Sequence, residues 1–199
     1  MGPSDLVLPP LPTKYRKGRE PTGLSMEAGV LLRSERLSLR ACSREELLSI
    51  YRGDTSFIEH AESWPSREFV ESLPHFINDM MEDPANYGWN VYLIMDRSGR
   101  VVGDCGFKGP PSSSGEVEIA FSIVGSERRK GYAGEAVKML VDRAFAREDV
   151  SSLIAECSEG NTASRRLLMS LGFTVIWSGN GVLIYSISKK DLTARTAPR

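Results

Sequence analysis

The spacing of apolar residues predicts helices early in the chain. Over residues 66–82, apolar side chains recur every three or four positions, the period of one face of a helix. Proline has no backbone N–H to donate, so Pro74 is expected to kink or split this helix. A shorter helix is predicted at about 44–52, because Ser43 followed three residues later by Glu46 matches a capping box.

The central part of the chain has the pattern of β-strands instead. Apolar and β-prone residues dominate two runs, at 89–95 and 101–108, with a turn sequence between them. A connection rich in Gly, Pro and Ser leads to a third run at 116–124. These runs predict an antiparallel meander, and a strand or hairpin arm is expected before it, at about 30–40.

The last part of the chain alternates between the two periods. It predicts a helix, a short strand, a second helix and an antiparallel strand pair, at about 132–147, 153–157, 162–170, 173–177 and 182–187. The step from strand to helix to strand makes one parallel pair through a right-handed crossover. The predicted fold is α+β: an α/β three-layer sandwich with a mixed, mostly antiparallel central sheet and flanking helices.

Composition divides the chain into three parts. Residues 1–29 are rich in Pro and Gly, which disfavour regular structure, and are expected to form a flexible leader. Residues 30–190 hold the predicted elements and form the expected domain. Residues 191–199 are expected to be a C-terminal tail.

Charge and cysteine content weigh against several classes of function. The chain has 25 Lys+Arg and 26 Asp+Glu, whereas a broad nucleic-acid-binding surface usually makes a domain strongly basic. Its three cysteines show no metal-ligand or redox spacing, so neither a metal site nor a disulfide framework is expected. No apolar run approaches the roughly 18 residues of a membrane span, and no signal peptide is recognisable. A cytoplasmic protein with no nucleic-acid or membrane partner is therefore expected.

One segment, between the third strand of the meander and the next helix, points to anion binding. Three basic residues run into a small-residue stretch, Arg128-Arg129-Lys130-Gly131-Tyr132-Ala133-Gly134. Unpaired N–H groups at a helix N-terminus attract anions, and small residues let a ligand approach the backbone. The segment predicts a pyrophosphate site. The Walker pattern is absent, and taken alone the segment also fits a basic turn and helix cap without a ligand.

Further motifs in order give this segment a family context. Arg128-x-x-Gly131-x-Ala133 resembles the Gln/Arg-x-x-Gly-x-Gly/Ala signature of the GCN5-related N-acetyltransferase (GNAT) superfamily. Downstream, Asn161-Thr-Ala-Ser164 and a later Leu-Gly-Phe resemble the second motif of that family. The resemblance covers about residues 30–190. It is closest to the branch that includes the ribosomal-protein N-terminal acetyltransferases.

The resemblance implies acetyl-CoA as the cofactor. Loop amides would hold its pyrophosphate, and its pantetheine arm would pair with a strand where the segments 116–124 and 153–157 splay apart. The implied cofactor-binding residues are Ile123 and Val124 on the strand, Arg128, Arg129, Lys130, Gly131, Tyr132, Ala133 and Gly134 in the loop, Asn161, and Arg166 or Arg165 towards the 3′-phosphate.

The resemblance also implies catalytic residues. Glu118 matches a family position that often holds an active-site Glu, and is predicted to be the general base; a solvent-facing strand carboxylate is the alternative. Many members carry a Tyr that protonates the departing thiolate, where this chain has Leu168. Either that role is vacant, or Ser164 or Tyr132 supplies it. Ser164 is also expected to hold Asn161 or the thioester end in place.

The implied function is transfer of an acetyl group from acetyl-CoA to a primary amine by direct attack on the thioester. The amine belongs to a protein N-terminus or a small molecule. Acidic residues of the early helical region favour a cationic acceptor, namely Asp54, Glu59, Glu62 and Glu68. The alternatives are a non-catalytic acyl-CoA-binding regulatory domain and a binder of another nucleotide phosphate. Dimers are common in the family, so a homodimer is among the expected states.

Overall fold

The computed structural model describes residues 30–83 and 86–196, and is built around one sheet. Eight strands lie in the order β1-β2-β3-β4-β5-β6-β8-β7. Their bounds are β1 (Leu31–Arg33), β2 (Ser38–Ala41), β3 (Val91–Met95), β4 (Val101–Phe107), β5 (Glu116–Ile123), β6 (Ser152–Ser158), β7 (Thr174–Gly179) and β8 (Val182–Ser188). Neighbouring strands are antiparallel except β5 and β6, which form the predicted parallel pair.

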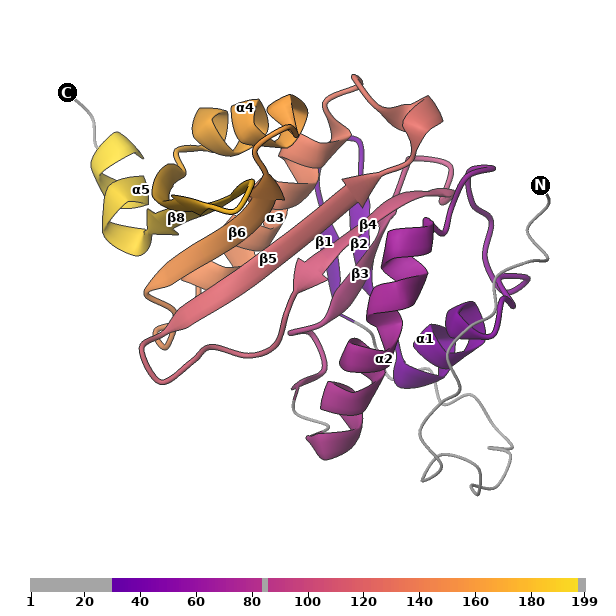
Figure 1. Ribbon diagram of the computed structural model, residues 1–199. Helices are drawn as coiled ribbons and strands as arrows, with labels where there is room; N and C mark the ends of the chain where they lie inside the picture. The colour runs from indigo at the N-terminus through magenta and orange to yellow at the C-terminus, as the bar shows by residue number, and fades with distance from the viewer. Residues whose placement is uncertain (1–29, 84–85, 197–199) are drawn as a thin grey trace.

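Helices cover both faces of the sheet (Figure 1). They are α1 (Arg44–Tyr51), α2 (Arg67–Glu82), α3 (Tyr132–Phe145), α4 (Thr162–Leu171) and α5 (Lys189–Thr196), with a 3-10 turn at Gly125–Glu127. The apolar sides of α1 and α2 pack on one face of the sheet, and α3 packs on the other. The predicted α+β sandwich with a mostly antiparallel sheet is confirmed.

The first two helices begin as their sequences predict, and the second is continuous through its proline. Ser43 and Glu46 form the capping box of α1. Helix α2 is not split at Pro74, and runs without a break over its whole length. The proline removes one hydrogen bond, the one to the carbonyl of Val70. Buried apolar residues on both sides of the proline, including Phe69 and Ile77, anchor the two halves of the helix to the same core.

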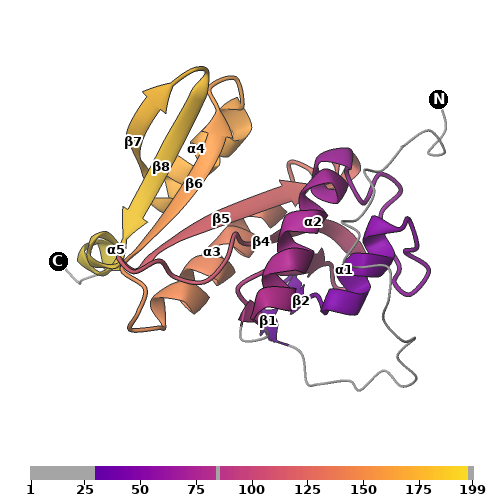
Figure 2. The same cartoon turned by 60° about the horizontal axis from the view of Figure 1, so that its bottom comes forward.

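The sheet opens between β5 and β6. Parallel pairing joins Glu116 to Ser152 and ends at the pair Glu118 and Ile154, although both strands continue further. Figure 2 shows the two strands diverging beyond this point, with β6 continuing into the antiparallel unit of β8 and β7. One edge of β5 is therefore without a strand partner beyond Glu118.

The C-terminal part of the domain follows the predicted hairpin and then adds a helix. β7 and β8 are joined at Asn180-Gly181, where both residues have positive φ, as tight hairpin turns require. Helix α5 was not predicted, because its polar sequence carries no apolar stripe. The predicted leader, 1–29, lies outside the described residues. Among the helices of the described ranges, none is long and apolar enough to cross a membrane.

Candidate active site

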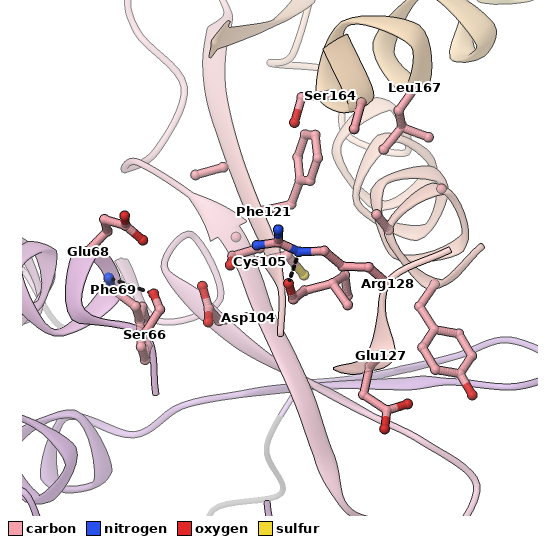
Figure 3. A pocket seen from close by; sticks show the side chains of 18 of the residues that line it. Ser66, Glu68, Phe69, Asp104, Cys105, Phe121, Glu127, Arg128, Ser164 and Leu167 are labelled. Carbon is pink, nitrogen blue, oxygen red and sulfur yellow. Dashed lines mark hydrogen bonds between the residues drawn. The ribbon is translucent and has the colours of Figure 1, made fainter. Parts of the chain in front are cut away.

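A cavity of about 780 Å³ lies at the open end of β5 (Figure 3). It is bounded by β4, β5, the loop after β5, and helices α2, α3 and α4. Nine predicted site residues line it: Ile123, Arg128, Arg129, Gly131, Tyr132, Ala133, Gly134, Asn161 and Ser164. The other four, Glu118, Val124, Lys130 and Arg166, are not among its lining residues.

The loop before α3 presents backbone donors to this cavity. Arg129 and Gly131 have φ of 63° and 82°, so the chain turns sharply into the helix. Gly131 is the N-cap of α3 and offers no side chain to the first-turn amides. The N–H groups of Tyr132, Ala133 and Gly134 have no partner within the helix and are available to an anion.

A half-buried network of hydrogen bonds supports this loop from behind. The carboxylate of Glu135 accepts hydrogen bonds from Nε of Arg36 at 2.8 Å and from Oγ of Ser34 at 2.6 Å. The same arginine donates through Nη1 to the carbonyl oxygen of Lys130 at 2.8 Å. These donors hold the pKa of Glu135 below its ordinary value despite its partial burial. The turn between β1 and β2 is thus tied to the start of α3.

A second carboxylate neutralises part of the positive charge of the loop. Glu127 is buried and accepts from Arg100 at 2.9 Å and from Lys130 at 2.6 Å. The hydrogen bond from Lys130 is the main cause that lowers the pKa of Glu127. The ammonium of Lys130 is therefore held beside Glu127. Arg128 and Arg129 line the cavity, and Arg128 also donates through Nε to the carbonyl oxygen of Ile123 at 2.9 Å.

The backbone of β5 divides its hydrogen-bonding groups between β4 and the open edge. The carbonyl of Glu118 and the N–H of Val124 both bond to the β4 side. In an antiparallel pair these groups alternate, so those of Phe121 and Ile123 point towards the gap. Both backbone groups of Val124 are engaged, the N–H with Val102 and the carbonyl with the N–H of Glu127. Phe121, which the sequence did not single out, thus turns its backbone groups towards the same gap as Ile123.

Helix α4 closes one side of the cavity. Asn161 caps the helix by accepting from the N–H of Ser164 at 3.1 Å, and both residues line the cavity. Leu168, at the family's Tyr position, is fully buried in the core below the helix. Arg166 is exposed on the helix surface. A side chain at 168 therefore packs beneath α4, and Ser164 is the hydroxyl that this helix presents to the cavity.

Glu118 lies at the point where β5 and β6 part, on the same face of β5 as Ala120 and Ser122. Its carboxylate forms an ion pair with Lys108. Ala120 and Ser122 lie between Glu118 and the loop that follows β5. Ala120 and Ser122 reach the cavity wall, whereas Glu118 does not. Its predicted role as general base stays a prediction.

Two carboxylates that the sequence reasoning did not place in the site occur at the α2 end of the cavity. They are Glu68, from the first turn of α2, which the sequence places only in an acidic region, and Asp104, for which the motifs predict no role. Asp104 is 8% exposed, and burial raises its pKa to about 7. Its signal in the sequence was a carboxylate in the middle of the otherwise apolar run of β4. Cys105 beside it is buried, and burial raises its pKa well above its ordinary value, so it stays a neutral thiol.

Sequence comparisons identify the family. The model of the acetyltransferase (GNAT) domain matches residues 36–174. The chain is 33% identical over 150 residues to the uncharacterized N-acetyltransferase YjdG of Bacillus subtilis, covering 72% of this chain and 89% of the relative.

Solved structures share the fold. The RimL ribosomal L7/L12 α-N-protein acetyltransferase in complex with coenzyme A aligns over 80% of this chain and 98% of its own, with a TM-score of 0.59 and 18% identity. The dodecameric spermidine N-acetyltransferase of Vibrio cholerae aligns over 82% of this chain and 100% of its own, with a TM-score of 0.59 and 17% identity.

The chain therefore belongs to the GNAT family, as the resemblance indicated. It is an acetyl-CoA-dependent N-acetyltransferase of that family.

Proposed function

We propose that this chain transfers the acetyl group of acetyl-CoA to a primary amine, on a protein N-terminus or a small molecule, by direct attack on the thioester. One observation carries the proposal: a single cavity extends from a phosphate-binding loop, along an unpaired strand edge, to two carboxylates under α2. Such a cavity suits a long phosphorylated cofactor at one end and a cationic acceptor at the other.

The cofactor half of the cavity fits pyrophosphate and pantetheine. The first-turn amides of α3, with Arg128 and Arg129, offer donors and positive charge to a pyrophosphate. The open-edge groups of Phe121 and Ile123 suit the amides of pantetheine, which need partners once they leave water. Lys130 contributes its backbone to the loop while its side chain stays with Glu127. Arg166 is exposed outside the cavity, so the only part of the cofactor that we propose it binds is the 3′-phosphate.

The acceptor half of the cavity is acidic. Glu68 and Asp104 share the cavity with the apolar side chains of Phe69 and Phe76. Negative charge beside an apolar wall favours an ammonium group on a short aliphatic or peptide stem. The names of the two solved neighbours, a protein α-amino acetyltransferase and a spermidine acetyltransferase, support the same acceptor class.

The reaction has two requirements. The amine must lose a proton before it attacks, and the carbonyl of the thioester must be polarised. The leaving group of the acetyl-CoA thioester is a thiolate. An ordinary thiol has a pKa near 8.5, so this thiolate leaves readily. In this proposal a backbone N–H at the open edge of β5 stabilises the negative charge that develops on the carbonyl oxygen. Ser164 is the hydroxyl offered to the departing sulfur. Cys105 is kept neutral by its burial and is a poor nucleophile, which favours direct transfer without an acyl-enzyme.

The test measures release of free thiol from acetyl-CoA with three amines, each assayed alone. They are a peptide with a free N-terminus, spermidine, and a primary amine that carries no further charge. Gly131→Asp should abolish turnover, since it puts a carboxylate and a strained φ at the anion site. Gly181→Asp is the matched control, because Gly181 has a similar φ of 76° in the distant hairpin turn. Loss of activity in both variants, or in neither, would contradict the proposed placement of the pyrophosphate.

The homodimer and the cytoplasmic location remain predictions. Sedimentation of the purified chain tests the first of them. β7 lies at the edge of the sheet and exposes Val175, Ile176 and Trp177, which makes this edge the surface to mutate if a dimer is found.

A further inference from the structure

We propose that Asp104 is the carboxylate that binds the acceptor's ammonium group and takes its proton. The inference rests on the proposed function and assigns one step of it to a residue for which the family motifs gave no role. It is carried by the position of Asp104 in the cavity, by its burial, and by the absence of a cation beside it among the described residues.

The position of Asp104 follows from strand register. Asp104 on β4 pairs directly with Ser122 on β5, and both line the cavity. Paired residues of an antiparallel sheet project their side chains to the same face. That face is the one that α2 covers, and Figure 3 shows Asp104 between the residues of α2 and the cofactor half of the cavity. The carboxylate therefore lies at the junction of the acceptor half and the open edge of β5.

The buried polar side chains of the described residues differ in the hydrogen bonds and ion pairs that they form. The amide of Asn90 donates to the carbonyl of Phe76 and accepts from the N–H of Val91. Glu127 is held by two cations, Arg100 and Lys130. Asp104 accepts one hydrogen bond, at 3.2 Å, from the neutral indole Nε1 of Trp64. A buried carboxylate without a cation is costly, so its retention inside a cavity indicates a cation that arrives from outside.

The surroundings of Asp104 suit it to accept a proton near neutral pH. Among the titratable and charged groups near it, Glu68 from α2 lines the same cavity and acts on it through its charge, and the thiol of Cys42 is a further neighbour. Cys105 follows it on β4 with its side chain on the opposite face, and Arg128 lines the same cavity. Desolvation is the largest cause of its raised pKa, the hydrogen bond from Trp64 opposes it, and the charge of Glu68 adds to it. A general base is most effective when its pKa lies near the working pH.

The proposed step balances in atoms and charge. The ammonium R–NH3⁺ gives one proton to the carboxylate of Asp104, leaving R–NH2 and a neutral Asp104. The nitrogen lone pair forms the C–N bond at the thioester carbonyl. The C–S bond then breaks with its electron pair going to sulfur, and the second nitrogen proton passes to that sulfur. Asp104 returns its proton to solvent, so the products are the amide, free coenzyme A and one proton.

Two carboxylates now compete for the role of base. Glu118 already has a cation partner in Lys108 and lies outside the cavity lining, whereas Asp104 has no such partner and lines it. The proposal therefore predicts that Asp104→Asn costs more in kcat/KM than Glu118→Gln. The expected loss for Asp104→Asn is about 100-fold or more, a common contribution of a general base. The affinity for acetyl-CoA should stay within about twofold, since the phosphate loop is untouched.

The pH profile separates a base from a merely structural residue. In the wild type, kcat/KM should rise with pH to an inflection near the pKa of Asp104, about 7. The Asp104→Asn variant should lose that limb. Trp64→Phe removes the hydrogen bond that favours the ionised form, so the limb should move to higher pH. Asp149→Asn, at an exposed ion pair with Arg147, is the control and should leave the profile unchanged.

The outcomes distinguish this inference from the proposed function. If the wild type acetylates an amine and Asp104→Asn keeps both its rate and its acidic limb, the inference is overturned and the function stands. If no tested amine is acetylated, the slow hydrolysis of acetyl-CoA provides the same comparison, with water in the place of the amine. If the wild type neither binds nor turns over acetyl-CoA, the proposed function fails first. Asparagine can still accept from Trp64, and the melting temperature with bound acetyl-CoA checks that the variant is folded.

Discussion

Arg36 and Glu135, 99 positions apart in the sequence, form a salt bridge at 2.6 Å directly behind the loop that precedes α3. Glu135 lies in the first turn of α3, and the guanidinium of Arg36 also bonds to the carbonyl of Lys130. A Cβ atom on Gly131 would come within 3.2 Å of Nη2 of Arg36. The loop conformation is therefore fixed by a side chain from the first hairpin of the domain.

Breaking this contact should loosen the loop and weaken cofactor binding. Glu135→Gln removes the charge that holds Arg36, and we expect the Kd for acetyl-CoA, measured by calorimetry, to rise about tenfold, equivalent to about 1.4 kcal/mol. Glu46→Gln is the matched control, because Glu46 likewise lies in the first turn of a helix and binds an arginine, Arg40, but far from the loop.

The two variants should separate stability from binding. Both should lower the melting temperature by a similar amount, since each loses one partly buried ion pair. An acetyl-CoA affinity that falls equally in both variants would show that the Arg36–Glu135 contact has no specific effect on the loop.

The raised pKa of Asp104 also has a consequence for stability. Its pKa in the folded state, about 7, lies above the value of about 3.9 expected in the unfolded chain. Between these two pH values the folded state binds more protons than the unfolded chain. The free energy of unfolding therefore decreases as the pH rises towards 7. The loss approaches about 4 kcal/mol for a shift of three units.

Asp104→Asn should remove this dependence. Denaturant unfolding at pH 5 and pH 8 should show that the variant gains stability relative to the wild type at the higher pH. A constant difference between the two proteins at both pH values would mean that Asp104 titrates normally.

The Tyr position of the family is informative because Leu168 is buried here. Leu168→Tyr should overpack the core below α4, with a cost of about 1–3 kcal/mol in the free energy of unfolding. We expect no gain in kcat, since the ring would stay beneath the helix. Met169→Tyr, at a half-exposed neighbouring position, should be nearly neutral in stability. A kcat that increases in Leu168→Tyr would show that this position reaches the cavity.

Ser164 is the hydroxyl on α4 that lines the cavity, and its removal should affect chemistry more than binding. We expect Ser164→Ala to lower kcat up to about tenfold, a modest effect because a thiolate with a pKa near 8.5 leaves without full protonation. Ser170→Ala, on the same helix, removes only a local hydrogen bond to the carbonyl of Leu167. Equal rates in all three proteins would assign Ser164 to the cap with Asn161 and not to catalysis.

Local patterns predicted most of the fold. The capping box of α1, the apolar stripe of α2 and the meander all depend on residues close in sequence, and each formed as expected. The helix continues through Pro74 because burial on both sides outweighs one missing hydrogen bond, and local propensity does not report burial. Helix α5 was missed because its sequence has no apolar period.

The candidate site could be predicted where it depends on a contiguous motif. The segment from Arg128 to Gly134 lines the cavity with every residue except Lys130, and pyrophosphate binding by it stays a prediction. Contacts between distant segments were not predictable: Arg36 reaches Glu135 only after the sheet and α3 are in place. The side-chain direction of Asp104 depends on the register of β4 with β5, so its place in the cavity became visible only in three dimensions.

Calorimetric titration of the purified protein with acetyl-CoA decides whether the cavity along β5 is an acetyl-CoA site. We expect the wild type and Gly181→Asp to bind acetyl-CoA saturably at micromolar affinity, and Gly131→Asp not to bind it. Absence of binding to the wild type at millimolar acetyl-CoA, or equal binding to Gly131→Asp, would contradict it.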